Sequence, residues 1–170
     1  MLRDGDTFER AGRKFRVRMP YDDDATAPWK REDGHGVVSE WTSRAKRPGE
    51  MVLCSDRRRV KRYYDFAAAV KTARKDGWDA EPYSDAETAG QRAHKAAMAD
   101  FRYLRGWAND EWHYVGVIVE LLDDEGDTIE GEDASLWGVE GYARAYLGKV
   151  AAELADEVLY NLERRIALRA

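Results

Sequence analysis

The feature that most constrains the fold is a nearly uncharged apolar run at residues 112–122, WHYVGVIVELL. Four of the five residues at 115–119 are Val or Ile, which favour strands. The apolar residues do not alternate with polar ones, and this is typical of a strand buried on both faces, or nearly so. A core helix is the competing interpretation, but Gly116 and the β-branched residues favour a strand. The acidic, glycine-containing segment 123–127 then predicts a hairpin turn.

Hydrophobic periodicity elsewhere predicts the remaining elements. Helices are predicted at 66–76, 85–108 and 142–168, and strands at 7–10, 14–19, 51–54 and 128–139, with the return strand beginning near 128–130 and ending near 135–139. Ser84 or Asp85 is predicted to cap the second helix, and Ser84 and Glu87 have the spacing of a capping box. We therefore predict an α+β fold, in which a mainly antiparallel sheet is covered on one face by about three helices.

A chain of 170 residues is most simply one domain, large enough to bury a core without disulfides. Within residues 1–170 we predict a basic, strand-rich segment 1–64, a helical segment 65–110, a hairpin 111–140 and a long C-terminal helix 141–170. The single cysteine, Cys54, suits a reducing compartment. Neither an apolar signal core nor a membrane-length apolar run is present in the sequence, so we expect a cytoplasmic protein without membrane contact.

The net charge of −5 conceals an asymmetry. Residues 1–75 contain 19 Lys and Arg against 12 Asp and Glu, whereas residues 76–170 contain 9 against 21. This pattern indicates either a dipolar fold or two surfaces that suit different partners. The densest acidic segment predicts a partner-binding surface made of Asp123, Asp124, Glu125, Asp127, Glu130, Glu132 and Asp133.

The most basic segment is at residues 57–64, RRRVKRYY. Cations beside aromatic rings suit phosphate contact together with base stacking. The alternative nucleic-acid site is therefore Arg57, Arg58, Arg59, Lys61, Arg62 and Tyr63. A charged edge strand that resists aggregation is the structural interpretation of the same pattern.

Motifs for catalysis and cofactors are absent from the sequence. There is no phosphate-binding glycine loop, no serine nucleophile elbow and no zinc-ligand spacing. We predict no catalytic residues, metal or cofactor, and favour a non-enzymatic protein. A metal-dependent nuclease is a third interpretation, which would require a carboxylate cluster from Asp33, Asp56, Glu111 and Glu120, with His35 or His113.

The order of several short motifs resembles a group of small uncharacterised proteins of tailed bacteriophages and prophages. These motifs are 27–29 (APW), 33–41 (DGHGVVSEW), 46–50 (KRPGE), 64–66 (YDF), 76–78 (DGW), 113–117 (HYVGV), 135–140 (SLWGVE), 146–147 (YL) and 153–155 (ELA). They cover most of the chain. The group has no established activity, so no residue inherits a catalytic role.

The resemblance implies a protein that acts in the cytoplasm of an infected bacterium. Small phage accessory proteins often act by binding, for example by blocking an anti-phage defence complex. We therefore predict a non-enzymatic protein that inhibits or modulates a host protein complex, through an acidic surface that mimics DNA. The alternative is a nucleic-acid-binding accessory protein of phage DNA metabolism. The apolar end of the C-terminal helix, with Leu159, Leu162, Ile166 and Leu168, also suits a homodimer.

Overall fold

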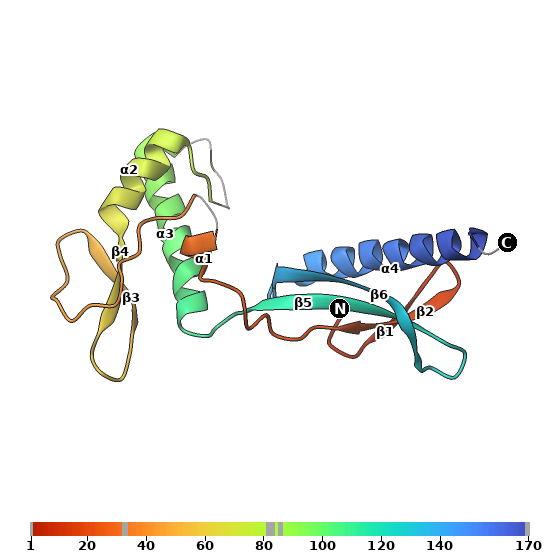
Figure 1. Ribbon diagram of the computed structural model, residues 1–170. Coiled ribbons are helices and arrows are strands. Elements are labelled where there is room, and N and C mark those ends of the chain that lie inside the picture. The colour runs from red at the N-terminus through yellow and green to blue at the C-terminus, as the bar shows by residue number, and fades with distance from the viewer. Residues whose placement is uncertain (1, 32–33, 81–83, 85–86, 169–170) are drawn as a thin grey trace. The chain divides into compact units, whose positions relative to one another are not determined.

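The computed structural model describes residues 2–31, 34–80, 84 and 87–168 (Figure 1). Its strands are β1 (Thr7–Arg10), β2 (Arg13–Arg18), β3 (Glu50–Ser55), β4 (Lys61–Asp65), β5 (Tyr114–Leu122) and β6 (Thr128–Glu140). Its helices are α1 (Pro28–Arg31), α2 (Phe66–Asp76), α3 (Ala89–Ala108) and α4 (Arg144–Ala167). Each pair of neighbouring strands is antiparallel. The predicted α+β class is confirmed.

Backbone contacts within this fold separate two compact units. Unit 1 comprises Met1–Ala25 and Trp112–Ala170, and unit 2 comprises Thr26–Glu111. The strands predicted within residues 1–64 therefore divide between the units, since β1 and β2 belong to unit 1 whereas β3 belongs to unit 2. Each unit has its own hydrophobic core.

Unit 1 is built on a four-stranded sheet in the order β1-β2-β5-β6. Seven of the nine residues of β5 are buried, as the unbroken apolar run predicts. The strand begins at Tyr114, two residues later than expected. Helix α4 lies along one face of the sheet (Figure 1). The core between them contains Phe15, Val17, Val117, Val119, Leu121, Leu147, Val150, Leu154 and Val158.

An irregular register between β5 and β6 brings Trp137 against Gly116. Val115 pairs with Val139 and Val117 pairs with Leu136, so β6 contains one extra residue at this point. A Cβ atom at position 116 would lie only 2.7 Å from the Trp137 ring. Glycine is required here because the indole occupies the space of a side chain.

Unit 2 pairs a two-stranded sheet, β3-β4, with helices α2 and α3. Asp65 caps α2, with its side chain accepting a 2.9 Å bond from the N–H of Ala68. Gly77, with φ +70°, ends that helix and the N–H of Trp78 returns to the carbonyl of Ala73.

The predicted start of the second long helix is wrong. Helix α3 begins at Ala89, and its capping box joins Thr88 to Gln91. Ser84 instead accepts a turn bond from the N–H of Glu87 through its carbonyl, while Asp85 lies outside the described residues. Both pairs satisfy the capping-box pattern, and sequence spacing alone does not decide between them.

The three long helices also differ from the prediction in their partners. Helix α4 covers the four-stranded sheet, whereas α2 and α3 pack on each other and on β3. The helical periodicity predicts a buried stripe on each helix. In α3 the stripe residues Ala93, Ala97, Phe101 and Leu104 are buried, whereas Trp107, expected in the same stripe, is half-buried. Periodicity does not identify the surface against which a stripe packs.

The last turns of α4 extend beyond its core contacts. Val158 is buried, but Ile166 and Leu168 are 59% and 83% exposed. Leu159 and Leu162 remain half-buried against the core. An exposed apolar end is therefore present on the helix predicted to support a homodimer, and the homodimer itself stays a prediction.

Candidate functional site

The seven acidic residues predicted to bind a partner all lie on the hairpin formed by β5, β6 and their turn, within unit 1. Asp123 has a structural role there. Its Oδ1 accepts hydrogen bonds from the N–H groups of Glu125 and Asp127, at 3.0 and 2.9 Å. Gly126, with φ +92°, completes the turn. The Asp123 carboxylate is therefore committed to holding the loop.

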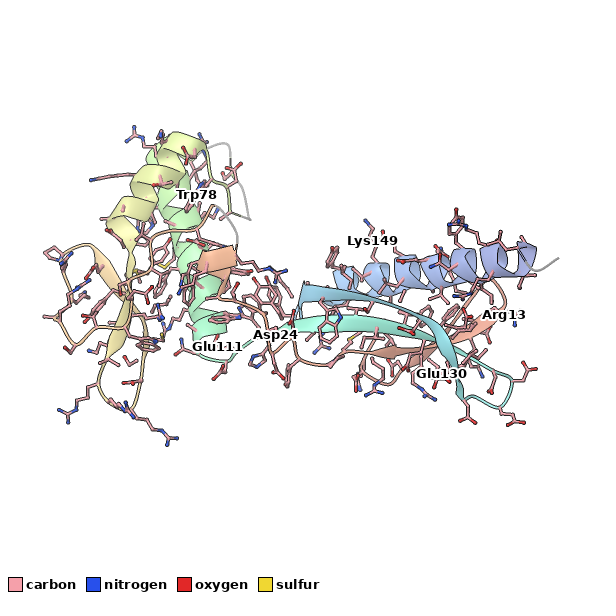
Figure 2. All side chains as sticks on the ribbon, in the orientation of Figure 1. Arg13, Asp24, Trp78, Glu111, Glu130 and Lys149 are labelled. Carbon is pink, nitrogen blue, oxygen red and sulfur yellow. The ribbon has the colours of Figure 1, made fainter. Side chains whose placement is uncertain are left out.

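The first part of β6 bulges beyond the turn. Thr128 pairs with Leu122 and Asp133 pairs with Glu120, so β6 advances five residues while β5 advances two. Gly131, with φ +76°, supports this irregular path. Figure 2 shows Glu130 at the bent end of β6, near the turn. Bulges redirect side chains away from the regular pleat.

Five of the seven carboxylates are exposed and form no ion pair with any described residue: Asp124, Glu125, Asp127, Glu130 and Asp133. Glu132 differs, because its half-buried side chain is paired with Arg165 of α4. We call these five residues the acidic hairpin surface. Unit 1 as a whole contains 11 Lys and Arg against 19 Asp and Glu, a net charge of −8.

Two residues lie next to this surface in the strand register: Glu120, which the sequence suggested only as a metal ligand, and Arg16, which sequence reasoning missed. Glu120 of β5 faces Asp133 on one side and Arg16 of β2 on the other. Arg16 donates a 3.0 Å hydrogen bond to the carbonyl of Gly126 in the turn. Oε2 of Glu120 is buried without a hydrogen-bond partner among the described residues. No sequence signal could reveal this group, because it depends on the register of three strands.

The basic segment forms the tip of the other hairpin, β3-β4, in unit 2. Arg57, Arg58 and Arg59 are exposed in its turn. Oδ1 of Asp56 accepts hydrogen bonds from the N–H groups of Arg58 and Val60, at 2.8 and 3.1 Å. Asp56 thus holds this turn as Asp123 holds the acidic one.

The other members of the predicted nucleic-acid set are less exposed to solvent. The Arg62 side chain is only 13% exposed and lies over the rings of Trp41 and Trp29. Tyr63 is 2% exposed, and its hydroxyl donates a 2.8 Å bond to the carbonyl of Arg44. Lys61 is half-buried. Tertiary packing turns Arg62 and Tyr63 into unit 2, so these two members of the predicted set expose little surface, and the nucleic-acid site itself stays a prediction.

Asp100 of α3 is the centre of a polar network that the sequence did not reveal as a unit. Its Oδ1 lies 2.6 Å from Nδ1 of His35, and its Oδ2 accepts bonds from the Gly36 N–H and the Tyr64 hydroxyl, at 2.8 and 2.6 Å. Burial, followed by the hydrogen bond to Asp100, raises the pKa of the Tyr64 hydroxyl above its ordinary value.

This network holds the loop that contains Gly34, His35 and Gly36 against α3. The His35 ring also stacks on Tyr103, with 5.5 Å between centroids. A Cβ at Gly36 would lie 2.5 Å from the Tyr64 ring, so the loop backbone lies directly against that ring. The available signal was the position of Asp100 between Ala97 and Phe101 on the buried stripe of α3. A buried carboxylate there requires donors from another segment.

Of the carboxylates suggested for a metal-dependent nuclease, the structure describes Asp56, Glu111 and Glu120. Asp56 and Glu111 belong to unit 2 and Glu120 to unit 1, while Asp33 lies outside the described residues. Among the residues that the structure describes, no group of three or more His, Cys, Asp or Glu side chains is placed to hold a metal ion.

The helices in the described part of the chain include none that is long and apolar enough to cross a membrane. Comparison with protein-family models, curated proteins and solved structures finds no match to this chain.

Proposed function

We propose that this chain is a non-enzymatic, phage-encoded accessory protein that binds and inhibits or modulates a host protein complex in the bacterial cytoplasm. An anti-phage defence complex that works on DNA is the partner class that suits it. The observation that carries the proposal is the acidic hairpin surface, in which five exposed carboxylates are gathered on one hairpin of a unit with net charge −8.

The physical argument rests on charge complementarity. Protein grooves that bind DNA carry lysine and arginine side chains, which neutralise phosphates. A surface rich in carboxylates enters the same positive field and competes with DNA for it. Asp124, Glu125 and Asp127 are held close together by the Asp123 turn, so little ordering is needed before they bind.

The test is capture of host proteins by the immobilised full-length chain. The expected partner is a DNA-binding protein or complex that is released by double-stranded DNA and by raised salt. A variant that neutralises the acidic hairpin surface should capture at least about tenfold less, because mutual attraction across the interface is lost. Its substitutions are Asp124→Asn, Glu125→Gln, Asp127→Asn, Glu130→Gln and Asp133→Asn.

A matched control neutralises the same number of exposed carboxylates elsewhere in unit 1, namely Asp23, Asp24, Glu153, Glu157 and Glu163. It changes net charge equally and should bind like the wild type. Equal loss in both variants would show that net charge alone matters. Unchanged capture by the hairpin variant would reject the proposed surface.

A nucleic-acid-binding function is the second candidate, supported by the three exposed arginines of the β3-β4 turn. This function has weaker support from the structure than from the sequence, since Arg62 and Tyr63 are turned inward. The structure adds no support for a nuclease.

A further inference from the structure

An open pocket in unit 2 is lined by three of the six tryptophans in the chain. Trp29, Trp41 and Trp107 line a space of about 380 Å³, together with Lys30, Arg62 and Cys54. This volume falls in the range of small-molecule sites, which are mostly apolar with a few fixed polar groups. Neither the acidic hairpin surface nor the Asp100 network contributes to it.

Two helices position two of the three tryptophans that line the pocket. Trp29 lies in α1 and Trp107 in the last turn of α3, and α1 lies against α3 (Figure 1). Their rings meet edge to face, with centroids 5.4 Å apart and planes at 90°. Edge-to-face pairs are a favoured aromatic geometry. The two rings therefore support each other before any ligand enters.

Arg62 fixes the third wall and determines the charge of the site. Its guanidinium carbon lies 5.0 Å from the Trp41 centroid and 5.7 Å from that of Trp29. Nη1 donates a 3.0 Å bond to the carbonyl of Ser39 and lies 3.5 Å from Glu40. Because the cavity already contains a protein cation, a second cation from a ligand is not favoured there.

The remaining groups favour a flat heteroaromatic ring that carries an anion. The indole N–H of Trp29, a residue of the pocket wall, is buried and has no acceptor among the described residues, so the wall contains an unsatisfied hydrogen-bond donor. Lys30 is about half exposed and lies 3.8 Å from Glu40. The Glu40 side chain is 77% exposed, so a phosphate can replace it beside Lys30 and Arg62.

We propose that this tryptophan pocket binds a nucleoside phosphate, whose base stacks on the indole rings and whose phosphate lies near Lys30 and Arg62. Stacking on aromatic side chains tolerates any base, since every base has a π-face. The ligand is either a free nucleotide or a nucleotide within a single strand. The proposal is independent of the acidic hairpin surface, which lies in unit 1.

The experiment titrates the full-length protein with AMP, GMP, CMP and UMP, and with a single-stranded oligo(dT) of about 12 nucleotides. Tryptophan fluorescence reports binding. Trp41→Ala, at a site that is 46% exposed, should weaken binding about tenfold or more. Lys30→Ala should weaken the binding of AMP but leave the binding of adenosine unchanged. Trp137→Ala in unit 1, at a ring that is 48% exposed, is the matched control and should bind like the wild type.

Cys54 supplies a readout that needs no variant. It is the only cysteine of the chain and lines the pocket, so bound nucleotide should slow its reaction with a thiol reagent. If oligo(dT) binds more tightly than every mononucleotide, the ligand is a nucleotide within a single strand. If a mononucleotide binds more tightly than oligo(dT), the ligand is a free nucleotide. The proposal is overturned if no probe binds at about 1 mM. It is also overturned if binding survives Trp41→Ala and Lys30→Ala but is lost when Arg57, Arg58 and Arg59 are neutralised.

Discussion

At the scale of single residues, identical side chains have different roles according to their partners. Asp123 and Asp124 are neighbours, yet the first holds the turn and the second is exposed to solvent. Glu50 and Glu130 differ in the same way, because Arg44 and Arg47 bind Glu50 whereas Glu130 is exposed to solvent. Only a carboxylate that no backbone or guanidinium group already binds is available to a partner protein.

Glu50 is the residue for which this difference gives a pH dependence. Its carboxylate accepts 2.7 and 2.5 Å bonds from the Arg44 guanidinium and a 2.7 Å bond from the Arg47 N–H. Hydrogen bonding to Arg44, followed by that to Arg47, lowers the pKa of Glu50 from 4.5 to about 2, against the opposing effect of burial. The folded protein therefore binds fewer protons than the unfolded chain in this range.

This shift stabilises the fold above the unfolded pKa, and the stabilisation is lost as the pH falls from 4.5 towards 2. We expect Glu50→Gln to reduce the free energy of unfolding at pH 7 and to flatten its decline in acid. Urea titrations at several pH values measure both effects. Glu153→Gln, at an exposed site on α4, controls for the lost charge. Parallel acid curves for wild type and Glu50→Gln would contradict the assignment.

At the scale of elements, the β3-β4 and β5-β6 hairpins have the same type of turn but carry opposite charge. In each turn an aspartate, Asp56 or Asp123, accepts two backbone N–H bonds. The tips then carry three arginines in β3-β4 and acidic residues in β5-β6. Similar turn chemistry presents a basic loop in unit 2 and an acidic loop in unit 1.

The contact of Gly116 with Trp137 gives a prediction about the β5-β6 pair. Gly116→Ala should lower the free energy of unfolding by about 1–3 kcal/mol, because the added methyl group meets the indole. Trp137→Ala should remove most of this cost in the double variant, which urea unfolding can measure as a coupling energy.

Gly148→Ala on α4 is the control with the opposite sign. A Cβ there meets nothing within 4 Å, and alanine is the better helix former by about 0.5–1 kcal/mol. If Gly116→Ala costs the same with and without the Trp137 ring, the indole is not the cause.

At the scale of the whole molecule, the chain has two sets of buried residues that share no member. Val117 belongs to the core of unit 1, and Leu104 belongs to a core of unit 2. The N-terminal segment reaches unit 1 because β2 pairs with β5, and Arg10 binds Asp156 of α4 through two 2.7 Å hydrogen bonds. Local opening in one unit therefore need not expose the other core.

Hydrogen exchange tests this independence. Val117→Ala should reduce protection in peptides of unit 1, and Leu104→Ala in peptides of unit 2. Each substitution leaves a cavity, and the cavity left by the leucine costs about 2–5 kcal/mol. Protection in the other unit should change little. Equal loss of protection throughout the chain after either substitution would show one cooperative core.

The sequence by itself determined the elements and the local chemistry. The unbroken apolar run identified β5, periodicity identified the stripes of α2, α3 and α4, and the turn signal placed the acidic residues on one hairpin. These properties depend on neighbours within a few positions, which spacing records directly.

The tertiary structure decided which surfaces meet. It divided the helices between two sheets, turned Arg62 and Tyr63 inward, joined Asp100 to the loop at His35 and gathered three tryptophans around one cavity. Each of these features joins residues distant in sequence, through strand register or the packing of one element on another. A stripe or an alternation shows that a face is buried, but the identity of its partner depends on shape and contact across the whole fold.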